Sequence, residues 1–213
     1  MLVFPIGDDN VPSSYTPRVS RALLVLNVVI FLYQVIIPWQ ALNQLIMQFG
    51  AVPQVLTSWH QLYSLITSAF LHGGRMHLIG NMLFLRVFAD NIEYHIGWKK
   101  FLLFYLLGAI AANVAHIIFN LGSRAPAIGA SWAISALLWA YRIRFPHAQI
   151  RVRSLQYRRA FSAPAQQFLI WWIARQVLFG VGAIGWGGWG IARRAHIGWF
   201  AFGVLRAKRQ KIY

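Results

Sequence analysis

The sequence predicts an all-α, polytopic membrane protein built as a bundle of six transmembrane helices. Of its 213 residues, 58% are hydrophobic and only 11% are charged, whereas a soluble domain carries roughly 25% charged residues. In addition, long apolar segments alternate with connections that hold most of the basic residues. Such a chain has too few charged side chains to cover a water-facing surface, so a multi-span membrane protein is expected.

Six segments qualify or nearly qualify as spans, given that a spanning helix needs about 20 apolar residues. They are residues 22–39, 76–88, 101–121, 131–145, 163–184 and 191–205. The second, fourth and sixth are short, so we expect them inside the bundle, and the second lengthens only if its helix continues toward Glu93. The predicted organisation is a tail at 1–21, a membrane domain at 22–205 and a basic tail at 206–213.

The long connection between the first two spans, residues 40–74, is semi-polar and contains Pro53 and Trp59. A connector of this length without structure of its own is uncommon in a compact domain. Tryptophan is enriched at membrane interfaces. We therefore expect this stretch to fold onto the membrane surface.

The distribution of basic residues predicts the orientation. No Lys or Arg occurs from Ala22 to Gly74. The positive-inside rule then places both termini in the cytoplasm. Fourteen of the 20 basic residues fall on that side: Arg18, Arg21, Lys99, Lys100, Arg142, Arg144, Arg151, Arg153, Arg158, Arg159, Arg206, Lys208, Arg209 and Lys211.

Composition also limits partners and compartments. The basic residues cluster between apolar segments, which fits membrane topology better than a nucleic-acid-binding face. Cysteine is absent, which excludes disulfides and thiolate metal sites. The first twenty residues lack the pattern of a cleavable signal peptide. Short tails favour a bacterial inner membrane as the location, and the oligomeric state cannot be predicted.

Four polar residues are predicted to share one depth in the membrane. The second, fourth and sixth spans all run from the outer face inward, and His77, Ser131 and His196 each lie near the start of one of them. Asn81 follows His77 by one helical turn, so both side chains point to the same side. A serine and a histidine at one depth, with further hydrogen-bond donors beside them, indicate nucleophilic catalysis within the bilayer.

Ser131 and His196 each have a structural interpretation beside the catalytic one. Ser131 follows Gly129 and Ala130 and is suited either to cap a helix or to act as a nucleophile at a helix start. His196 either bonds to another helix or acts as general base for Ser131. The four acidic residues are predicted on the cytoplasmic side, so the sequence permits a Ser–His dyad and no Ser–His–Asp triad. They are Asp8, Asp9, Asp90 and Glu93.

His77 and Asn81 suit an oxyanion site, because neutral N–H groups aimed at one point stabilise the charge that develops on the substrate. A zinc site formed by His72, His77 and His196 is the alternative. No HExxH motif and no nearby acid accompany these histidines, so neither a metal nor another cofactor is expected.

Several motifs together resemble the rhomboid family of intramembrane serine proteases, over about residues 59–203. This resemblance implies a six-helix core, Ser131 as nucleophile and His196 as base. It also implies an oxyanion site made by His77, Asn81 and the Ser131 backbone N–H, and the transmembrane helices of other proteins as substrates, with no cofactor. The motifs are Thr67-Ser-Ala-Phe-Leu-His72-Gly-Gly, His77-Leu-Ile-Gly-Asn81-Met, Asp90-Asn-Ile-Glu93, Gly129-Ala-Ser131 and Ala195-His196-Ile-Gly198.

The chain departs from the family pattern at three positions, where Trp132, Trp139 and Trp199 stand in place of glycines. Glycines at helix contacts permit close approach. An indole inside the Ser–His seam would separate the dyad, whereas one facing lipid would leave it intact. The alternative to a protease is therefore a rhomboid-like pseudoprotease that binds membrane helices. An unrelated channel or transporter is disfavoured because the two halves show no internal repeat.

Overall fold

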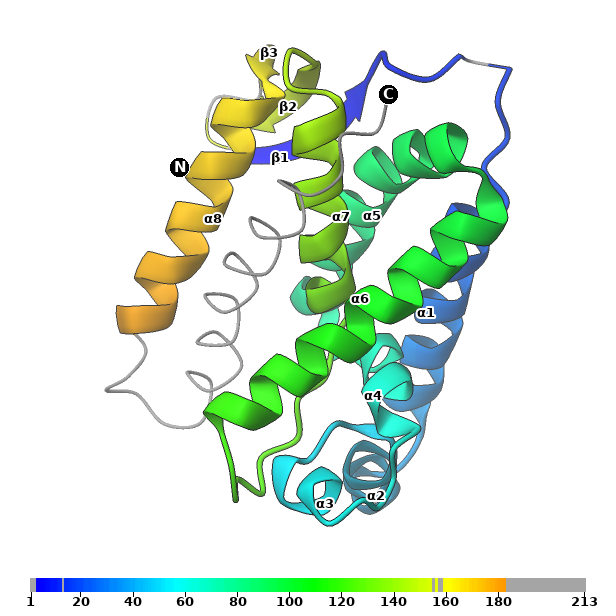
Figure 1. Ribbon diagram of the computed structural model, residues 1–213, viewed down its shortest axis with the longest axis vertical. Helices are drawn as coiled ribbons and strands as arrows, with labels where there is room; N and C mark the ends of the chain where they lie inside the picture. The colour runs from blue at the N-terminus through cyan, green and yellow to red at the C-terminus, as the bar shows by residue number, and fades with distance from the viewer. Residues whose placement is uncertain (1–2, 13, 155, 157–158, 183–213) are drawn as a thin grey trace.

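The computed structural model describes residues 3–182, except 13, 155 and 157–158. The predicted sixth segment, which contains His196 and Trp199, lies outside the described residues. Five long helices match the other five predicted segments, and α6 crosses the molecule obliquely in front of α5 (Figure 1). They are α1 (Val19–Ile36), α5 (Arg75–Ile96), α6 (Trp98–Phe119), α7 (Ser131–Arg144) and α8 (Ala165–Gly182).

Among the described helices, α1 and α6 are the two that are long and apolar enough to cross a membrane by length and composition alone. Helix α5 continues past its predicted end at residue 88 to Ile96, and it carries four charged residues. Helix α7 has 14 residues, which is about 21 Å of helix against a hydrocarbon core of about 30 Å. The full set of six spans therefore remains a prediction.

The connection at 40–74 is folded, as expected for its length. It forms α2 (Trp39–Phe49), α3 (Pro53–Thr57), α4 (Ser64–Thr67) and the 3₁₀ helix η1 (Ser68–Phe70). These elements gather at one end of the molecule, below the start of α5 in Figure 1. Thr67 ties them together, because its hydroxyl donates a hydrogen bond of 2.8 Å to the carbonyl of Phe49.

A small antiparallel sheet at the other end corrects the all-α prediction. Its strands lie in the order β1 (Val3–Asp8), β2 (Gln149–Ser154) and β3 (Ala160–Pro164) (Figure 1). Strand β2 alternates strictly: Ile150 and Val152 are fully buried, while Arg151 and Arg153 are exposed. Alternation of this kind is the pattern of a half-buried strand. The prediction missed it because the arginines had been assigned to a basic connection between helices.

Helix α5 is the centre of the apolar core. Its Leu85 and Phe88 are fully buried together with Leu137 and Tyr141 of α7. The rings of Phe88 and Tyr141 pack edge to face, with centroids 4.8 Å apart. This packing holds α7 against α5. It therefore also fixes the position of the start of α7, at Ser131, relative to the start of α5, at Arg75.

All four acidic residues lie at the sheet end of the molecule. The Asp8 carboxylate accepts hydrogen bonds from the Asn91 amide at 2.9 Å and from the Tyr141 hydroxyl at 3.0 Å. Asp9 pairs with Arg151 at 3.4 Å on the surface. Asp90 accepts from the same Asn91 amide at 3.0 Å. These contacts join the N-terminal strand to the ends of α5 and α7.

The fourth acid, Glu93, holds the start of α1. Its fully buried carboxylate accepts hydrogen bonds from three consecutive backbone N–H groups, those of Arg18, Val19 and Ser20, at 2.7–3.0 Å. The Ser20 hydroxyl adds a fourth at 2.6 Å. The first N–H groups of a helix have no partners within the helix. Glu93 therefore supplies from α5 the cap that the sequence of α1 lacks.

Replacing Glu93 by alanine is expected to lower the free energy of unfolding by at least about 3 kcal/mol, because each buried donor left unpaired costs about 1–3 kcal/mol. Thermal unfolding in detergent measures the loss. Asp9→Ala, which removes an exposed acid, is the matched control and should stay within about 0.5 kcal/mol of the wild type. Equal effects of the two substitutions would contradict the capping role.

Candidate functional site

Helix α7 begins at Ser131, after a sharp turn at Gly129. The backbone φ of Gly129 is +121°, a conformation that residues with a Cβ atom rarely adopt. The residue at the N-cap position is Ala130, and no side chain caps the helix. The capping interpretation of Ser131 is therefore wrong: Ser131 is the first residue of the helix, where the backbone N–H lacks a partner within the helix.

The turn at Gly129 meets the side chains of His77 and Asn81 on α5. A Cβ atom added to Gly129 would lie 2.7 Å from both Cε1 and Nε2 of His77 and 3.7 Å from Nδ2 of Asn81. The two α5 side chains thus lie against the backbone two residues before Ser131. The structure places His77 and Asn81 against the turn that leads into Ser131. The fourth predicted site residue, His196, lies outside the described residues.

Polar contacts from three other elements hold the Gly129 turn in place. The Gly129 N–H donates a hydrogen bond of 2.8 Å to the carbonyl of Ser68 in η1. The Asn113 amide of α6 donates to the Ser68 hydroxyl at 2.9 Å and to the carbonyl of Leu65 at 2.8 Å. Ala127 exchanges two backbone hydrogen bonds with Ala51, at 2.9 and 3.0 Å. The turn is therefore a fixed part of the structure.

Both α5 side chains offer N–H groups at this turn. The Nδ1 atom of His77 accepts a hydrogen bond from the Gly73 N–H at 3.4 Å. A neutral imidazole that accepts at one nitrogen carries its proton on the other. The donor is therefore Nε2, which lies with Cε1 at the Gly129 turn. The Asn81 amide nitrogen is buried and has no hydrogen-bond partner among the described residues. An unpaired buried donor is costly, and an oxyanion would satisfy it.

His72 lies beside this pair, in the loop before α5. Its ring is 2% exposed and meets the His77 ring edge to face, with centroids 5.1 Å apart. Burial, and to a lesser extent the neighbouring His77, lowers the pKa of His72 to about 4, so the ring is neutral at pH 7. Within the described residues no group of three or more His, Cys, Asp or Glu side chains is placed to hold a metal. The absence of a metal stays a prediction, because His196 is outside that set.

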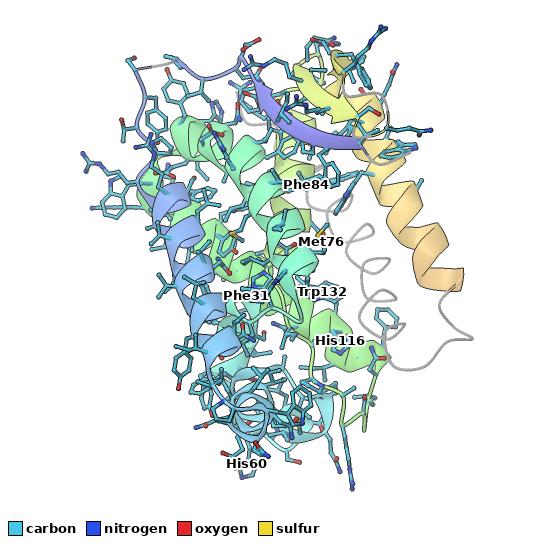
Figure 2. All side chains as sticks on the ribbon, turned by 180° about the vertical axis from the view of Figure 1, so that it is seen from behind. Phe31, His60, Met76, Phe84, His116 and Trp132 are labelled. Carbon is cyan, nitrogen blue, oxygen red and sulfur yellow. The ribbon has the colours of Figure 1, made fainter. Side chains whose placement is uncertain are left out.

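Trp132 fills a space between α6 and α7. Its side chain is 3% exposed and packs on Ala112, with Ala111, Ala115 and Ala136 around it. Its ring lies 6.0 Å from that of His116, near which it is labelled in Figure 2. The small residues of α6 therefore accommodate the indole. Trp139, one of the other departures, stacks with Arg142, whose guanidinium carbon lies 4.8 Å from the ring centroid.

No carboxylate lies near Ser131. Tyr141, which contacts Asp8, is ten residues along α7 from Ser131, or about 15 Å. Glu93 is sixteen residues along α5 from His77, or about 24 Å. All four acids of the chain make their contacts at the sheet end. A dyad that works without a carboxylate stays a prediction, because His196 lies outside the described residues.

The sequence prediction missed the residues that position the site, notably Gln34, Ser68 and Asn113. Gln34 is 3% exposed and bonds to the backbone of His72. The sequence contained a sign of two of them, because Gln34 and Asn113 are amides within apolar segments. Polar residues are costly there and usually serve structure or function. Only the fold shows which backbone groups they reach.

Replacing Gly129 by alanine is expected to lower the free energy of unfolding by about 1–3 kcal/mol, because the new Cβ would hold a strained φ and press on His77. The matched control is Gly80→Ala in the second turn of α5, where a Cβ meets nothing within 4 Å. It should raise stability by about 0.5–1 kcal/mol through helix propensity. Thermal unfolding of both variants in detergent tests the difference in sign, and two effects of the same sign would argue against the close approach.

Comparison with known proteins identifies the family. The Rhomboid domain model matches residues 59–208. RHOMBOID-like protein 12, mitochondrial, of Arabidopsis thaliana is 27% identical over 85% of this chain and 56% of its own length. Rhomboid protein 1, mitochondrial, of Saccharomyces cerevisiae is 32% identical over 61% of this chain and 37% of its own. Rhomboid protease GluP of Bacillus subtilis is 30% identical over 58% and 24%.

The chain thus spans between about a quarter and just over half of the length of these curated relatives. Relatives include proteins named as proteases and one named inactive. The matched region contains His77, Asn81, Gly129 and Ser131 and well over half of the chain. The chain therefore belongs to the rhomboid family of polytopic integral membrane proteins.

Proposed function

We propose that this protein is an intramembrane serine endopeptidase that cleaves transmembrane segments of other membrane proteins with a Ser131–His196 dyad. The observation that carries the proposal is the approach of His77 and Asn81 to the Gly129 turn, with 2.7 Å between the His77 ring and the position of an added Cβ. Two N–H donors are thereby held beside the helix start that carries a serine. Donors fixed before the reaction, where negative charge will develop, are the largest single contribution in many enzymes.

In the proposed reaction, the Ser131 hydroxyl attacks the carbonyl carbon of the scissile peptide while His196 accepts its proton. The carbonyl oxygen becomes an oxyanion, which accepts hydrogen bonds from Nε2 of His77, Nδ2 of Asn81 and the Ser131 backbone N–H. Collapse of the tetrahedral intermediate releases the amine, which takes the proton from His196. Water then hydrolyses the acyl-enzyme by the same steps in reverse roles.

Neither a third catalytic residue nor a cofactor has a place in this mechanism. The four acids of the chain are engaged at the sheet end, so His196 acts without a carboxylate partner. The oxyanion donors are neutral N–H groups, which stabilise charge strongly in a site from which water is excluded. The partners we propose are the lipid bilayer and a substrate helix that unwinds near the outer face, and nucleic acid is not among them.

The topology we propose has six spans with both termini on the cytoplasmic side or its equivalent. The supporting feature is charge: α7 and the hairpin after it carry Arg142, Arg144, Arg151 and Arg153 at the sheet end. Basic residues favour the inner side of a membrane. A bacterial inner membrane gains no support from the relatives, since two of the three described carry mitochondrial names.

A catalytically impaired protein that binds membrane helices is the second candidate. Tryptophans at 132, 139 and 199 replace family glycines, and they favour this alternative. The placement of Trp132 reduces the support for this alternative, because its indole packs on alanines of α6. Trp139 stacks with Arg142 further along α7, and Trp199 lies outside the described residues.

Reaction with a fluorophosphonate probe tests the proposal, because such probes bond covalently to activated serines. Purified protein in detergent or nanodiscs should be labelled, and Ser131→Ala should abolish labelling because the nucleophile is lost. The matched control is Ser135→Ala, one turn further along α7, where the hydroxyl donates to the Ser131 carbonyl at 2.7 Å. It should label within a few-fold of the wild type.

Cleavage of a reconstituted transmembrane substrate should follow the same order among the variants. Well-folded wild-type protein that neither labels nor cleaves, while still binding a membrane helix, would favour the pseudoprotease instead. Labelling that persists in Ser131→Ala would remove Ser131 as the nucleophile.

A further inference from the structure

Gln34 of α1 makes a two-point contact with the loop that precedes α5. Its Oε1 atom accepts a hydrogen bond from the His72 N–H at 3.0 Å, and its Nε2 atom donates to the His72 carbonyl at 3.2 Å. Both ends of the amide are therefore used on one backbone residue, 38 positions away in the sequence. A buried amide with both groups satisfied rigidifies its surroundings.

Gly73 follows His72 in the chain, and the backbone N–H of Gly73 sets the tautomer of His77. The Gly73 N–H points at Nδ1 of His77, at 3.4 Å. While Nδ1 accepts this bond, the proton of the neutral ring is on Nε2, which faces the Gly129 turn. The opposite tautomer would present a bare nitrogen to an oxyanion and repel it. The position of one backbone N–H thus decides whether His77 is a donor.

Through this loop, Gln34 of α1 influences the protonated nitrogen of His77 on α5. The loop from Leu71 to Gly74 contains two adjacent glycines and would have considerable backbone freedom if unanchored. Asn27, two turns earlier on α1 and similarly buried, has its contacts elsewhere. Its amide donates to the carbonyl of Leu23 at 2.7 Å, and its side chain meets the Tyr105 hydroxyl of α6.

We propose that Gln34 is a positioning residue that holds His77 in its Nε2–H tautomer through the backbone of His72 and Gly73. Its contribution to the reaction rests on the oxyanion role of His77 proposed above. Its contribution to the tautomer does not depend on activity, so the two proposals can fail separately.

The test compares Gln34→Leu with Asn27→Leu, which replaces a similarly buried amide on the same helix. Nitrogen NMR of protein labelled with ¹⁵N-histidine reports the tautomer of His77. The wild type and Asn27→Leu should show the Nε2–H form, whereas Gln34→Leu should show a mixture of both. Gln34→Met, which has an unbranched side chain of similar length, is used for the same comparison if the leucine variant does not fold.

The fluorophosphonate labelling rate provides the second readout. Gln34→Leu should lower it by about tenfold to a hundredfold, since small misplacements of a catalytic donor cost up to about 10²-fold, and Asn27→Leu by less than about threefold. A purely structural role would lower the unfolding temperature of both variants and leave the His77 tautomer unchanged, which would overturn the proposal. Wild-type protein that does not label contradicts the proposed function, while the NMR comparison still decides the role of Gln34.

Discussion

The absence of a side chain at Gly129 is the constraint on which the rest of the site depends. The ring of His77 lies 2.7 Å from the position that a Cβ atom of residue 129 would take, which is too close for a real Cβ contact. Only glycine both permits this approach and adopts a φ of +121° without strain. Because Ser131 follows two residues later, the same turn sets the start of α7 and the position of the proposed nucleophile. One backbone conformation therefore joins the donors of α5 to the serine of α7.

Polar side chains in apolar helices hold that approach in place. Asn113 reaches from α6 to Ser68, and Ser68 accepts the N–H of Gly129. Gln34 reaches from α1 to the backbone that precedes His77. Inside an apolar bundle each of these amides would be costly if it were unpaired. The bonds made by the Asn113 amide nitrogen and by both ends of the Gln34 amide are the same ones that orient the site. These bonds therefore support stability and geometry together.

Much of this arrangement follows from sequence pattern, and the remainder does not for identifiable reasons. Apolar length predicted the long helices. Helical spacing placed His77 and Asn81 on one side of α5, and both meet the turn before Ser131. The strand at Gln149–Ser154 was missed although it alternates, because its arginines also fit a basic connection. Ser131 is not a cap, since Ala130 occupies that position. The fit of Trp132 depends on the alanines of α6, a pairing that no local pattern contains.

We propose that His77 and Asn81 donate hydrogen bonds to an oxyanion that forms at Ser131. The measurement that tests it most directly is an experimental structure, in lipid, of the adduct with a fluorophosphonate, whose phosphoryl oxygen stands for that oxyanion. We expect a covalent bond to Ser131 Oγ, with the phosphoryl oxygen about 2.7–3.1 Å from Nε2 of His77 and Nδ2 of Asn81. A phosphoryl oxygen directed away from both side chains, or an adduct on another residue, would contradict it.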